Sequence, residues 1–430
     1  MTRRIQNIVR KPFRFLIILT ILLFLGHQGY STVMATGEPG AEQQEKARKP
    51  GKWIFDKARG KWWYKFDDGS YPKDEWEIIN NRWYHFDKYG WMEANKWIKS
   101  YNKWYYLNSS GATERGWLTL KGKTYHFADS GAMETGWQKI KNIWYYFDTS
   151  GAMRTGWVRI EYDDYFFENN GAYNPTVKRA LILGETSTAA VPINDVYFMY
   201  NMFLDYKNKG MNFANITKYP NATKANIFKK MDEVFSGSDE SDINYLYMTC
   251  HGGASGVLEL GYNREIITGY ELKNRLLRYK GKFVVFLDCC HAGVIISKEK
   301  SADNEEVDGK TSLQILEDFI EPFKEDLPKS GELAIPRFMV FASSRKDQLS
   351  WGGSTNSVAT KAWLMGAGWN PMTEKSDVQR ADTNQDKRVS VQELYNYSRS
   401  TVFSLNGNKK QEVVVYPMNC NFNILIRIGE

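Results

Sequence analysis

The chain has 430 residues, of which 42% are hydrophobic and 25% charged, and its formal net charge is +7 at pH 7. This length predicts two or three domains, because a single core rarely grows so large. Four cysteines are too few for a disulfide scaffold, and no C-x-x-C or Cys/His spacing indicates a metal site. Composition therefore excludes a small disulfide-rich or zinc-stabilised protein.

The first 35 residues have the pattern of a secretory signal peptide. Five basic residues precede an almost continuous apolar run from Phe15 to Leu25, which is shorter than the about 20 residues of a spanning helix. Val33-Met34-Ala35 supplies the small residues that a signal peptidase recognises. Cleavage near Ala35 would lower the formal charge from +7 to +2, so no nucleic-acid partner is expected. We expect a secreted protein without a transmembrane helix in its mature form, and an uncleaved anchor is the alternative.

Residues 36–50 are predicted to be a linker, and residues 51–173 repeat a pattern rich in Trp and Tyr. Five tryptophans follow one another at intervals of 21, 20, 20 and 20 residues: Trp76, Trp97, Trp117, Trp137 and Trp157. Each precedes an aromatic cluster that ends in a turn. A period this short predicts one β-hairpin per repeat, stacked on its neighbours into an all-β solenoid.

The aromatic clusters predict two different faces in each hairpin. Because side chains alternate across a strand, Trp144 and Tyr146 of W-Y-Y-F face one way, while Tyr145 and Phe147 face the other. One set can pack the solenoid, and the other can line an open groove that suits quaternary ammonium groups or sugar rings. Aromatic side chains that serve only as core are the alternative, since a solenoid has little else to pack.

The segment Gly136–Met153 carries the motif G-W-x(6)-W-Y-Y-F-x(3)-G-x-M and resembles the choline-binding and glucan-binding repeats of Gram-positive surface proteins. The resemblance implies attachment to the cell wall through aromatic cages made by three tryptophan pairs, namely Trp76 with Trp83, Trp97 with Trp104, and Trp137 with Trp144. Four departures from the motif, at Lys65, His85, Leu107 and Thr124, predict that some cages are incomplete. Whether the wall ligand is choline-bearing teichoic acid or a glycan stays open.

After a short hinge at Asn174-Pro175-Thr176, residues 177–430 alternate strand-like and helix-like patterns. This alternation predicts an α/β domain in which helices flank a mostly parallel central sheet.

Two β-prone runs of this domain, Ile243–Gly253 and Phe283–Gly293, end in C-H-G-G and D-C-C-H-A-G. If they are neighbouring parallel strands, His251 and Cys290 emerge together at the carboxyl ends, where α/β sheets place their ligands. An imidazole beside a thiol gives an activated nucleophile and its base. The alternative is that the cysteines at these two strand ends are only small core residues.

The order strand-H-G, then strand-D-x-C-H-x-G, resembles the caspase-like cysteine peptidases, and D-C-C-H-A-G is closest to the metacaspase and bacterial caspase-like branch. Further similarity between residues 177 and 428 includes Ala180–Gly184, Asn194–Met199, Ala222–Ile227 and Phe341–Ser350. The resemblance implies a caspase-like endopeptidase that acts on a protein or peptide. In it Cys290 is the nucleophile, His251 handles the leaving-group proton, and the backbone N–H groups of Gly252 and Cys290 are oxyanion donors.

The resemblance also puts Asp288 in the pocket for the substrate residue before the scissile bond, with Asp347 as a second acid nearby. A carboxylate in that pocket predicts cleavage after Arg or Lys. If Asp288 only accepts backbone hydrogen bonds, a legumain-like preference for Asn or Asp is the alternative. A wall-binding adhesin with an inactive peptidase domain is the alternative from another class.

The loop of residues 298–337 is unusually long for a compact domain. In the caspase-like family this position often carries the processing site, so cleavage after Lys298, Lys300 or Lys310 is one hypothesis. A plain insertion is the other.

The segment Asp382–Glu393 has the oxygen spacing of a calcium-binding loop, and the thiol chemistry itself needs no cofactor. The candidate ligands are Asp382, Asn384, Asp386, the carbonyl of Arg388, Ser390 and Glu393. Lys387 replaces the glycine wanted for a left-handed turn, at a cost of about 1 kcal/mol. A hydrogen-bonded turn that caps the next helix is the alternative.

Overall fold

The computed structural model describes residues 49–184, 190–253, 257–260, 265–290, 336–345, 348–352, 355–407 and 410–427. The chain divides into two compact units, Met1–Gly116 with Phe127–Met133, and Trp117–His126 with Glu134–Glu430. The predicted signal peptide, most of the linker and the loop after Lys298 up to residue 335 lie outside the described residues.

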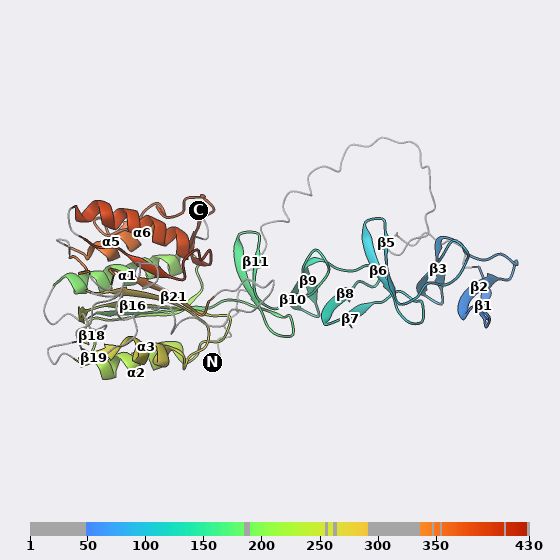
Figure 1. The fold of residues 1–430 in the computed structure, drawn as a ribbon, viewed down its shortest axis with the longest axis horizontal. Helices are drawn as coiled ribbons and strands as arrows, with labels where there is room; N and C mark the ends of the chain where they lie inside the picture. The colour runs from blue at the N-terminus through green and yellow to red at the C-terminus, as the bar shows by residue number, and fades with distance from the viewer. Residues whose placement is uncertain are drawn as a thin grey trace, which may run out of the picture. The chain divides into compact units, whose positions relative to one another are not determined.

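Residues 51–174 form successive antiparallel β-hairpins, one per sequence repeat (Figure 1). The strands are β1 (Gly51–Asp56), β2 (Lys61–Phe66), β3 (Glu75–Ile79), β4 (Arg82–Phe86), β5 (Lys96–Ser100), β6 (Lys103–Leu107), β7 (Gly116–Leu120), β8 (Lys123–Phe127), β9 (Gly136–Ile140), β10 (Ile143–Phe147), β11 (Gly156–Ile160) and β12 (Asp163–Phe167). A short β13 (Tyr173–Asn174) pairs with β12. Two-residue turns such as Asn80-Asn81, with φ of 49° and 63°, give the left-handed conformation that tight hairpins favour.

The last residue of each aromatic cluster forms the core of its repeat. Phe86, Leu107, Phe127, Phe147 and Phe167 are each 1% exposed or less. Their regular burial explains why the sequence period is kept, because each hairpin can bury its apolar side only against its neighbours. The prediction of an all-β hairpin-repeat solenoid is confirmed.

A six-stranded sheet forms the centre of the α/β part, in the order β15-β14-β16-β20-β21-β25. Its strands are β14 (Lys178–Gly184), β15 (Phe213–Tyr219), β16 (Ile243–Thr249), β20 (Lys282–Asp288), β21 (Phe338–Ala342) and β25 (Val414–Tyr416). All neighbours are parallel except β25, which is antiparallel to β21. Every residue of β16 is buried, as expected of a parallel strand covered on both faces.

Helices cover both faces of this sheet (Figure 1). On one face are α1 (Ala190–Asn208), α5 (Val358–Gly366) and α6 (Val391–Asn406), and on the other are α2 (Lys224–Phe235) and α3 (Gly269–Leu276). Small sheets add β17 (His251–Gly253) with β18 (Val257–Leu260) and β19 (Glu265–Thr268), β22 (Trp369–Asn370) with β23 (Lys375–Ser376), and β24 (Arg388–Ser390) with β26 (Asn423–Ile426). Among the described helices, none has the length and apolar character needed to cross a membrane.

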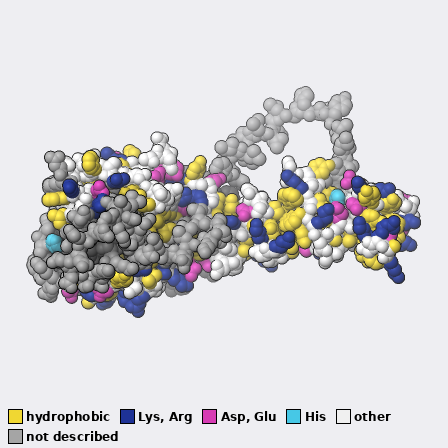
Figure 2. Space-filling model, in the orientation of Figure 1, with side chains coloured by type: hydrophobic (Ala, Val, Ile, Leu, Met, Phe, Trp, Pro, Cys, Tyr) yellow, Lys and Arg dark blue, Asp and Glu magenta, His cyan; other side chains and the backbone are white. Residues whose placement is uncertain are grey.

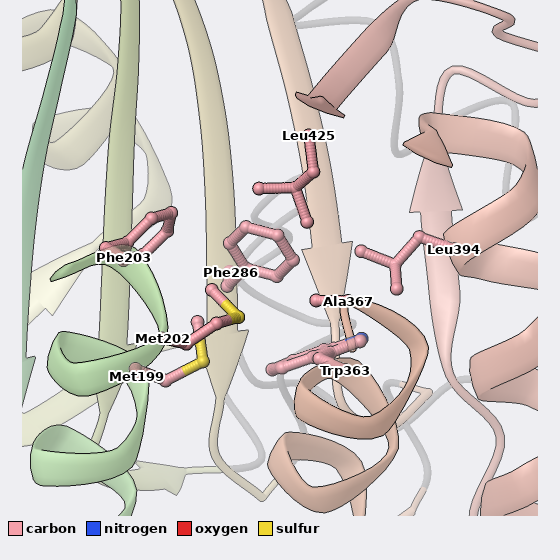
Figure 3. A pocket seen from close by; sticks show the side chains of 8 residues that line it. All are labelled: Met199, Met202, Phe203, Phe286, Trp363, Ala367, Leu394 and Leu425. Carbon is pink, nitrogen blue, oxygen red and sulfur yellow. The ribbon is translucent and has the colours of Figure 1, made fainter. Parts of the chain in front are cut away.

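A small pocket lies in the core between α1, β20, α5, α6 and β26 (Figure 3). Its lining consists of Met199, Met202, Phe203, Phe286, Trp363, Ala367, Leu394 and Leu425. Figure 3 shows these side chains converging from helices and strands that are far apart in sequence. Because the lining is apolar apart from one indole nitrogen, the pocket is part of the core and offers nothing to orient a polar substrate.

The sixth hairpin, β11–β12, packs against the α/β part within the second unit. Its periodic tryptophan, Trp157, is 8% exposed and meets Phe422 edge to face, with ring centroids 5.2 Å apart. Asp163 of the same hairpin forms a bidentate ion pair with Arg388, with N–O distances of 2.6 and 2.8 Å. The sequence groups this hairpin with the wall-binding repeats, whereas the packing makes it part of the α/β core.

Candidate functional site

The two strand ends that the sequence singles out are neighbours. The strands β16 and β20 pair in parallel, with Thr249 opposite Asp288 at the carboxyl end. Continuing this register by two residues brings His251 level with Cys290. The described part of the chain therefore places both residues at one edge of the sheet, where open α/β sheets place ligands.

The backbones at these strand ends are in close contact. A Cβ atom added to Gly252 would lie 1.8 Å from the carbonyl oxygen of Cys290. No side chain fits at that distance, so only glycine allows the segment after β16 to lie against Cys290. The glycine after His251 therefore has a packing reason as well as the proposed oxyanion role.

The two adjacent cysteines have different surroundings. Cys289 is 2% exposed in the core, and a hydrogen bond with Cys250, together with burial, raises the pKa of its thiol well above the usual value. Cys290 is only partly buried, and its Sγ lies 3.7 Å from the carbonyl oxygen of Ser350. Burial raises the pKa of the Cys290 thiol, so attack by this sulfur requires a base. Of these two thiols, Cys290 is the more accessible.

His251 is exposed at the start of β17, opposite Glu259 in the β17–β18 pair. An exposed imidazole at the same strand-end edge as a partly buried thiol is compatible with the exchange of a proton with a substrate. Asp347, which also belongs to the predicted site, lies outside the described residues.

Asp288 is buried, with 3% of its surface exposed. One carboxylate oxygen accepts a hydrogen bond of 2.9 Å from the Ser350 hydroxyl, and the other accepts hydrogen bonds from the hydroxyls of Ser357 and Thr360. Ser357 and Thr360 belong to the N-terminal end of α5, where the helix dipole favours a negative charge. Backbone N–H groups were the alternative partners expected for this carboxylate, whereas its partners here are side-chain hydroxyls.

A second buried acid, which the sequence analysis did not single out, adjoins Asp288. Asp195 of α1 is fully buried and accepts hydrogen bonds of 3.2 Å from the Asn356 side chain and 3.1 Å from the backbone of Ser357. Burial, and then the charge of Asp288, raise the pKa of Asp195 well above its usual value. A charged residue within the apolar pattern of α1 was the signal that could have revealed it.

Gln411 fixes the segment that lies next to Cys290. Its Nε2 donates to the carbonyl oxygen of Ser343 at 2.8 Å and to the hydroxyl of Ser350 at 3.2 Å. Its Oε1 accepts from the backbone of Trp351 at 3.2 Å and from Asn406 at 2.9 Å. These bonds hold Ser350, which contacts both Cys290 and Asp288.

Two of the predicted tryptophan pairs form right-angled arrangements in the hairpins. Trp97 and Trp104 have ring centroids 6.4 Å apart at 89°, and Trp137 and Trp144 have centroids 6.3 Å apart at 86°. Trp104 is 39% exposed, so its ring can meet a ligand. Figure 2 shows hydrophobic side chains next to Lys and Arg side chains on the visible face of the hairpins.

The third predicted pair, Trp76 with Trp83, differs. Trp76 is only 6% exposed, because it packs against His85 and Tyr105 with ring centroids 4.9 and 5.2 Å away. The His85 ring nitrogen Nδ1 is 2.6 Å from a carboxylate oxygen of Glu93. Trp76 is therefore part of the core and does not offer an open face, which corrects the expectation of a cage at this repeat.

Trp117 also packs against a histidine, but part of its ring is exposed to solvent. Its ring contacts His126, whose Nδ1 is 2.5 Å from a Glu134 oxygen, and Thr124 stands where the motif expects a second tryptophan. Trp117 is 43% exposed. The departures at His85 and Thr124 thus coincide with the repeats that have no right-angled tryptophan pair.

The predicted calcium loop is held by hydrogen bonds of its own. The Asp382 carboxylate accepts from the backbone of Asp386 at 3.1 Å and of Lys387 at 2.9 Å, and Lys387 has a φ of 65°. Glu393 and Ser390 form a capping box at the start of α6. The described residues contain no group of three or more His, Cys, Asp or Glu side chains arranged to hold a metal. Calcium binding here stays a prediction, and the alternative of a capping turn accounts for these contacts.

Comparison with known protein families identifies the repeats. Residues 114–155 match the family model of the choline-binding repeat, and residues 95–112 match that of a cell wall binding repeat. The chain therefore contains choline-binding repeats, as the motif predicts. No curated protein matches the chain.

Solved structures of pneumococcal proteins also resemble the chain. CbpJ from Streptococcus pneumoniae is 32% identical over 30% of this chain and 43% of that one, with a TM-score of 0.27. Choline binding protein F from the same species is 34% identical over 29% of this chain and 45% of that one, with a TM-score of 0.26. The cell wall endolysin of phage Cp-1, solved in complex with choline, is 37% identical over 31% and 40%, with a TM-score of 0.23. The chain thus spans less than half the length of each.

Proposed function

We propose that the hairpins attach this protein to choline-bearing polymers of a Gram-positive cell wall. The observation that carries the proposal is the pair of right-angled tryptophan arrangements, Trp97 with Trp104 and Trp137 with Trp144, within matched choline-binding repeats. Two indole faces at right angles can enclose a quaternary ammonium group, which is attracted by the ring quadrupoles. A glycan that stacks on the same rings is the competing ligand.

Retention on purified walls tests the attachment. The mature chain should bind choline-bearing walls and elute with free choline, and a Trp104→Ala/Trp144→Ala variant should bind weakly. Tyr89→Ala is the matched control, because Tyr89 is 65% exposed and belongs to neither pair. Elution by oligosaccharide and not by choline would favour a glycan, and failure to bind any wall would contradict the proposal.

A second function, that of a cysteine endopeptidase, is proposed for the α/β part. It is supported by the register that brings His251 level with Cys290 and by the close contact of Gly252 with Cys290. In this proposal, Cys290 gives its proton to His251, and the thiolate attacks the scissile carbonyl. Backbone N–H groups of Gly252 and Cys290 stabilise the oxyanion, and His251 protonates the leaving amine. Water then hydrolyses the acyl-enzyme.

The buried carboxylate of Asp288 supports a preference for Arg or Lys before the scissile bond. Asp288 adjoins the strand end that carries Cys290, and Asp195 shares the partner Ser357 with it. A cation that enters this region would find negative charge in surroundings with little water, where a charged hydrogen bond is strong. One of the hydroxyls that donate to Asp288 would have to move away, so that a carboxylate oxygen could accept a hydrogen bond from such a cation.

Peptides that differ only in the residue before the scissile bond test this function. Cleavage after Arg or Lys should be lost in Cys290→Ala, retained in Cys289→Ala, and strongly reduced in Asp288→Asn. Preference for Asn or Asp would support the legumain-like alternative. A folded, wall-binding chain that cleaves no peptide in the panel would support an adhesin with an inactive peptidase domain.

A further inference from the structure

Two thiols that the proposed peptidase chemistry does not use lie side by side at the ends of β16 and β20. The parallel register of these strands continues past their last residues, because the backbone N–H of Cys250 donates to the carbonyl oxygen of Asp288 at 3.3 Å. Cys250 is therefore level with Cys289, and the two thiols are in hydrogen-bond contact. Both are free cysteines in the structure.

This thiol pair is separate from the proposed catalytic pair. Cys250 and Cys289 both pack in the apolar cluster that the sheet forms with α2 and α3. His251 and Cys290, the next residue in each segment, alternate away from that cluster and do not belong to it. The remaining cysteine, Cys420, lies in the cluster on the other face of the sheet. Cys250 therefore has Cys289 as its partner thiol within this cluster.

The spacing of the two strands suits a covalent bond between these thiols. Neighbouring strands lie about 4.8 Å apart, which is within the about 4.4–6.8 Å that separates the Cα atoms of a disulfide. A bond between Cys250 and Cys289 can therefore form without large movement of the backbone. Thiols that lie together can also hold a metal, but the described residues offer no third ligand for one beside this pair.

The two thiols differ in their access to solvent. Cys250 is partly buried, whereas Cys289 is only 2% exposed, so Cys250 is the thiol that a small molecule can reach in the folded protein. The hydrogen bond with Cys250, together with burial, raises the pKa of the Cys289 thiol. Attack by Cys289 on a neighbouring sulfur should consequently become faster as the pH rises, because the thiolate is the nucleophile.

We propose that Cys250 and Cys289 are a modification site, at which they form a disulfide bond by exchange with a low-molecular-weight disulfide such as oxidising surroundings outside a cell supply. The Cys250 thiolate attacks one sulfur of this reagent, which gives a mixed disulfide and releases one small thiolate. The Cys289 thiolate then attacks the Cys250 sulfur and releases the second. Two protein thiols are oxidised, one external disulfide is reduced, and the two protons pass to the released thiolates.

The bond joins the two strand ends that carry the proposed catalytic pair. It closes the segment that contains β17, β18, β19 and α3, and so restricts the unfolded chain more than the folded one. Cys290 stays outside the bond and remains available as the proposed nucleophile. The proposal concerns the thiols alone and does not depend on peptide hydrolysis.

Incubation of the full mature chain with glutathione disulfide tests this inference, followed by alkylation in urea and mass spectrometry of the peptides. The expected product has Cys250 linked to Cys289 with the loss of two hydrogens, while Cys290 and Cys420 carry no link to another cysteine of the chain. The link should form faster at higher pH, and dithiothreitol should restore both thiols. The linked chain should also unfold at a higher urea concentration than the reduced chain.

Substitutions distinguish the adjacent cysteines in this experiment. Cys290→Ala should still form the link, whereas Cys250→Ala and Cys289→Ala should form none. Cys420→Ala is the matched control, because this cysteine is buried on the other face of the sheet and its loss should leave the link unchanged.

Two results would overturn the proposal. One is a link in which Cys290 takes the place of Cys289. The other is a folded wild-type chain whose Cys250 and Cys289 are still thiols in excess glutathione disulfide, or become linked only after unfolding. Either result can be read whether or not the chain cleaves peptides, so it leaves the proposed peptidase function to its own test.

Discussion

At Cys289 and Cys290, two adjacent thiols differ in what surrounds them. The first is buried in the core beside Cys250, and the second is partly exposed beside the Ser350 carbonyl. Strand alternation alone would give them opposite faces. The difference in exposure makes the assignment of the nucleophile testable without any substrate.

We expect a neutral alkylating reagent to label Cys290 faster than Cys289 in the folded protein. Because burial raises the pKa of Cys290, the labelling rate should still be rising with pH above neutrality. Cys289 should be labelled only after unfolding, since its thiol is buried and its pKa is raised further. Mass spectrometry of the labelled peptides between about pH 7 and about pH 10 measures both rates. Equal labelling of the two would contradict the assignment.

Lys178 of β14 is a buried cation whose charge opposes folding. Burial lowers the pKa of Lys178 from 10.5 to about 8. The negative charges of Asp163 and Asp242 offset only part of the effect of burial. The folded pKa is the lower one, so the unfolded chain holds more protons between about pH 8 and pH 10.5. The free energy of unfolding therefore rises with pH across this window, and below it the full cost is on the order of 3 kcal/mol.

Replacing Lys178 by Met should consequently raise the free energy of unfolding at pH 7. The gain should shrink as the pH rises from about 8 and level off only above 10.5, where the wild-type lysine becomes neutral in both states. Urea denaturation of the wild type, Lys178→Met and the exposed control Lys207→Met at several pH values measures the difference. A gain that does not change with pH would show that packing, and not charge, is responsible.

At the contact between β17 and the end of β20, Gly252 leaves no room for a side chain. In Gly252→Ala the new Cβ would lie 1.8 Å from the Cys290 carbonyl oxygen, so the two strand ends must separate. We expect a loss of about 1–3 kcal/mol in the free energy of unfolding and loss of any peptide hydrolysis. Denaturant unfolding and a peptide assay measure the two effects.

Gly237→Ala is the matched control for this substitution. Its nearest neighbour would be the flexible end of Arg179, 3.8 Å away, so stability and activity should stay near wild type. If Gly252→Ala behaved like Gly237→Ala, the close contact of the strand ends would not be required.

For the whole molecule, the position of the sixth hairpin decides where the chain can be divided. Trp157 and Phe166 belong to the core cluster that also contains Phe422, and Arg388 is paired with Asp163. A fragment of residues 154–430 should therefore unfold cooperatively, whereas one of residues 177–430 should be less stable or aggregate. Losing a buried Trp or Phe side chain typically costs about 3–5 kcal/mol. Thermal unfolding and size-exclusion chromatography compare the two fragments, and equal stability would contradict this packing.

The sequence by itself determined the repeating parts of this protein. A period of 20 or 21 residues specified one hairpin per repeat, because each hairpin buries its closing Phe or Leu only against a neighbour. Two apolar runs that end in His251 and Cys290 were enough to predict neighbouring parallel strands, since such a strand is buried on both faces.

Only the tertiary structure decided which of these residues share a site and which are core. Asp195 and Gln411 are distant in sequence from Cys290 and reach its surroundings through α5 and the segment after β21. Trp157 has the same sequence pattern as Trp97, yet it is buried against Phe422, a neighbour that the repeat period does not specify. Exposure depends on contacts between distant segments, and for that reason a repeat motif predicts the hairpin but not the ligand site.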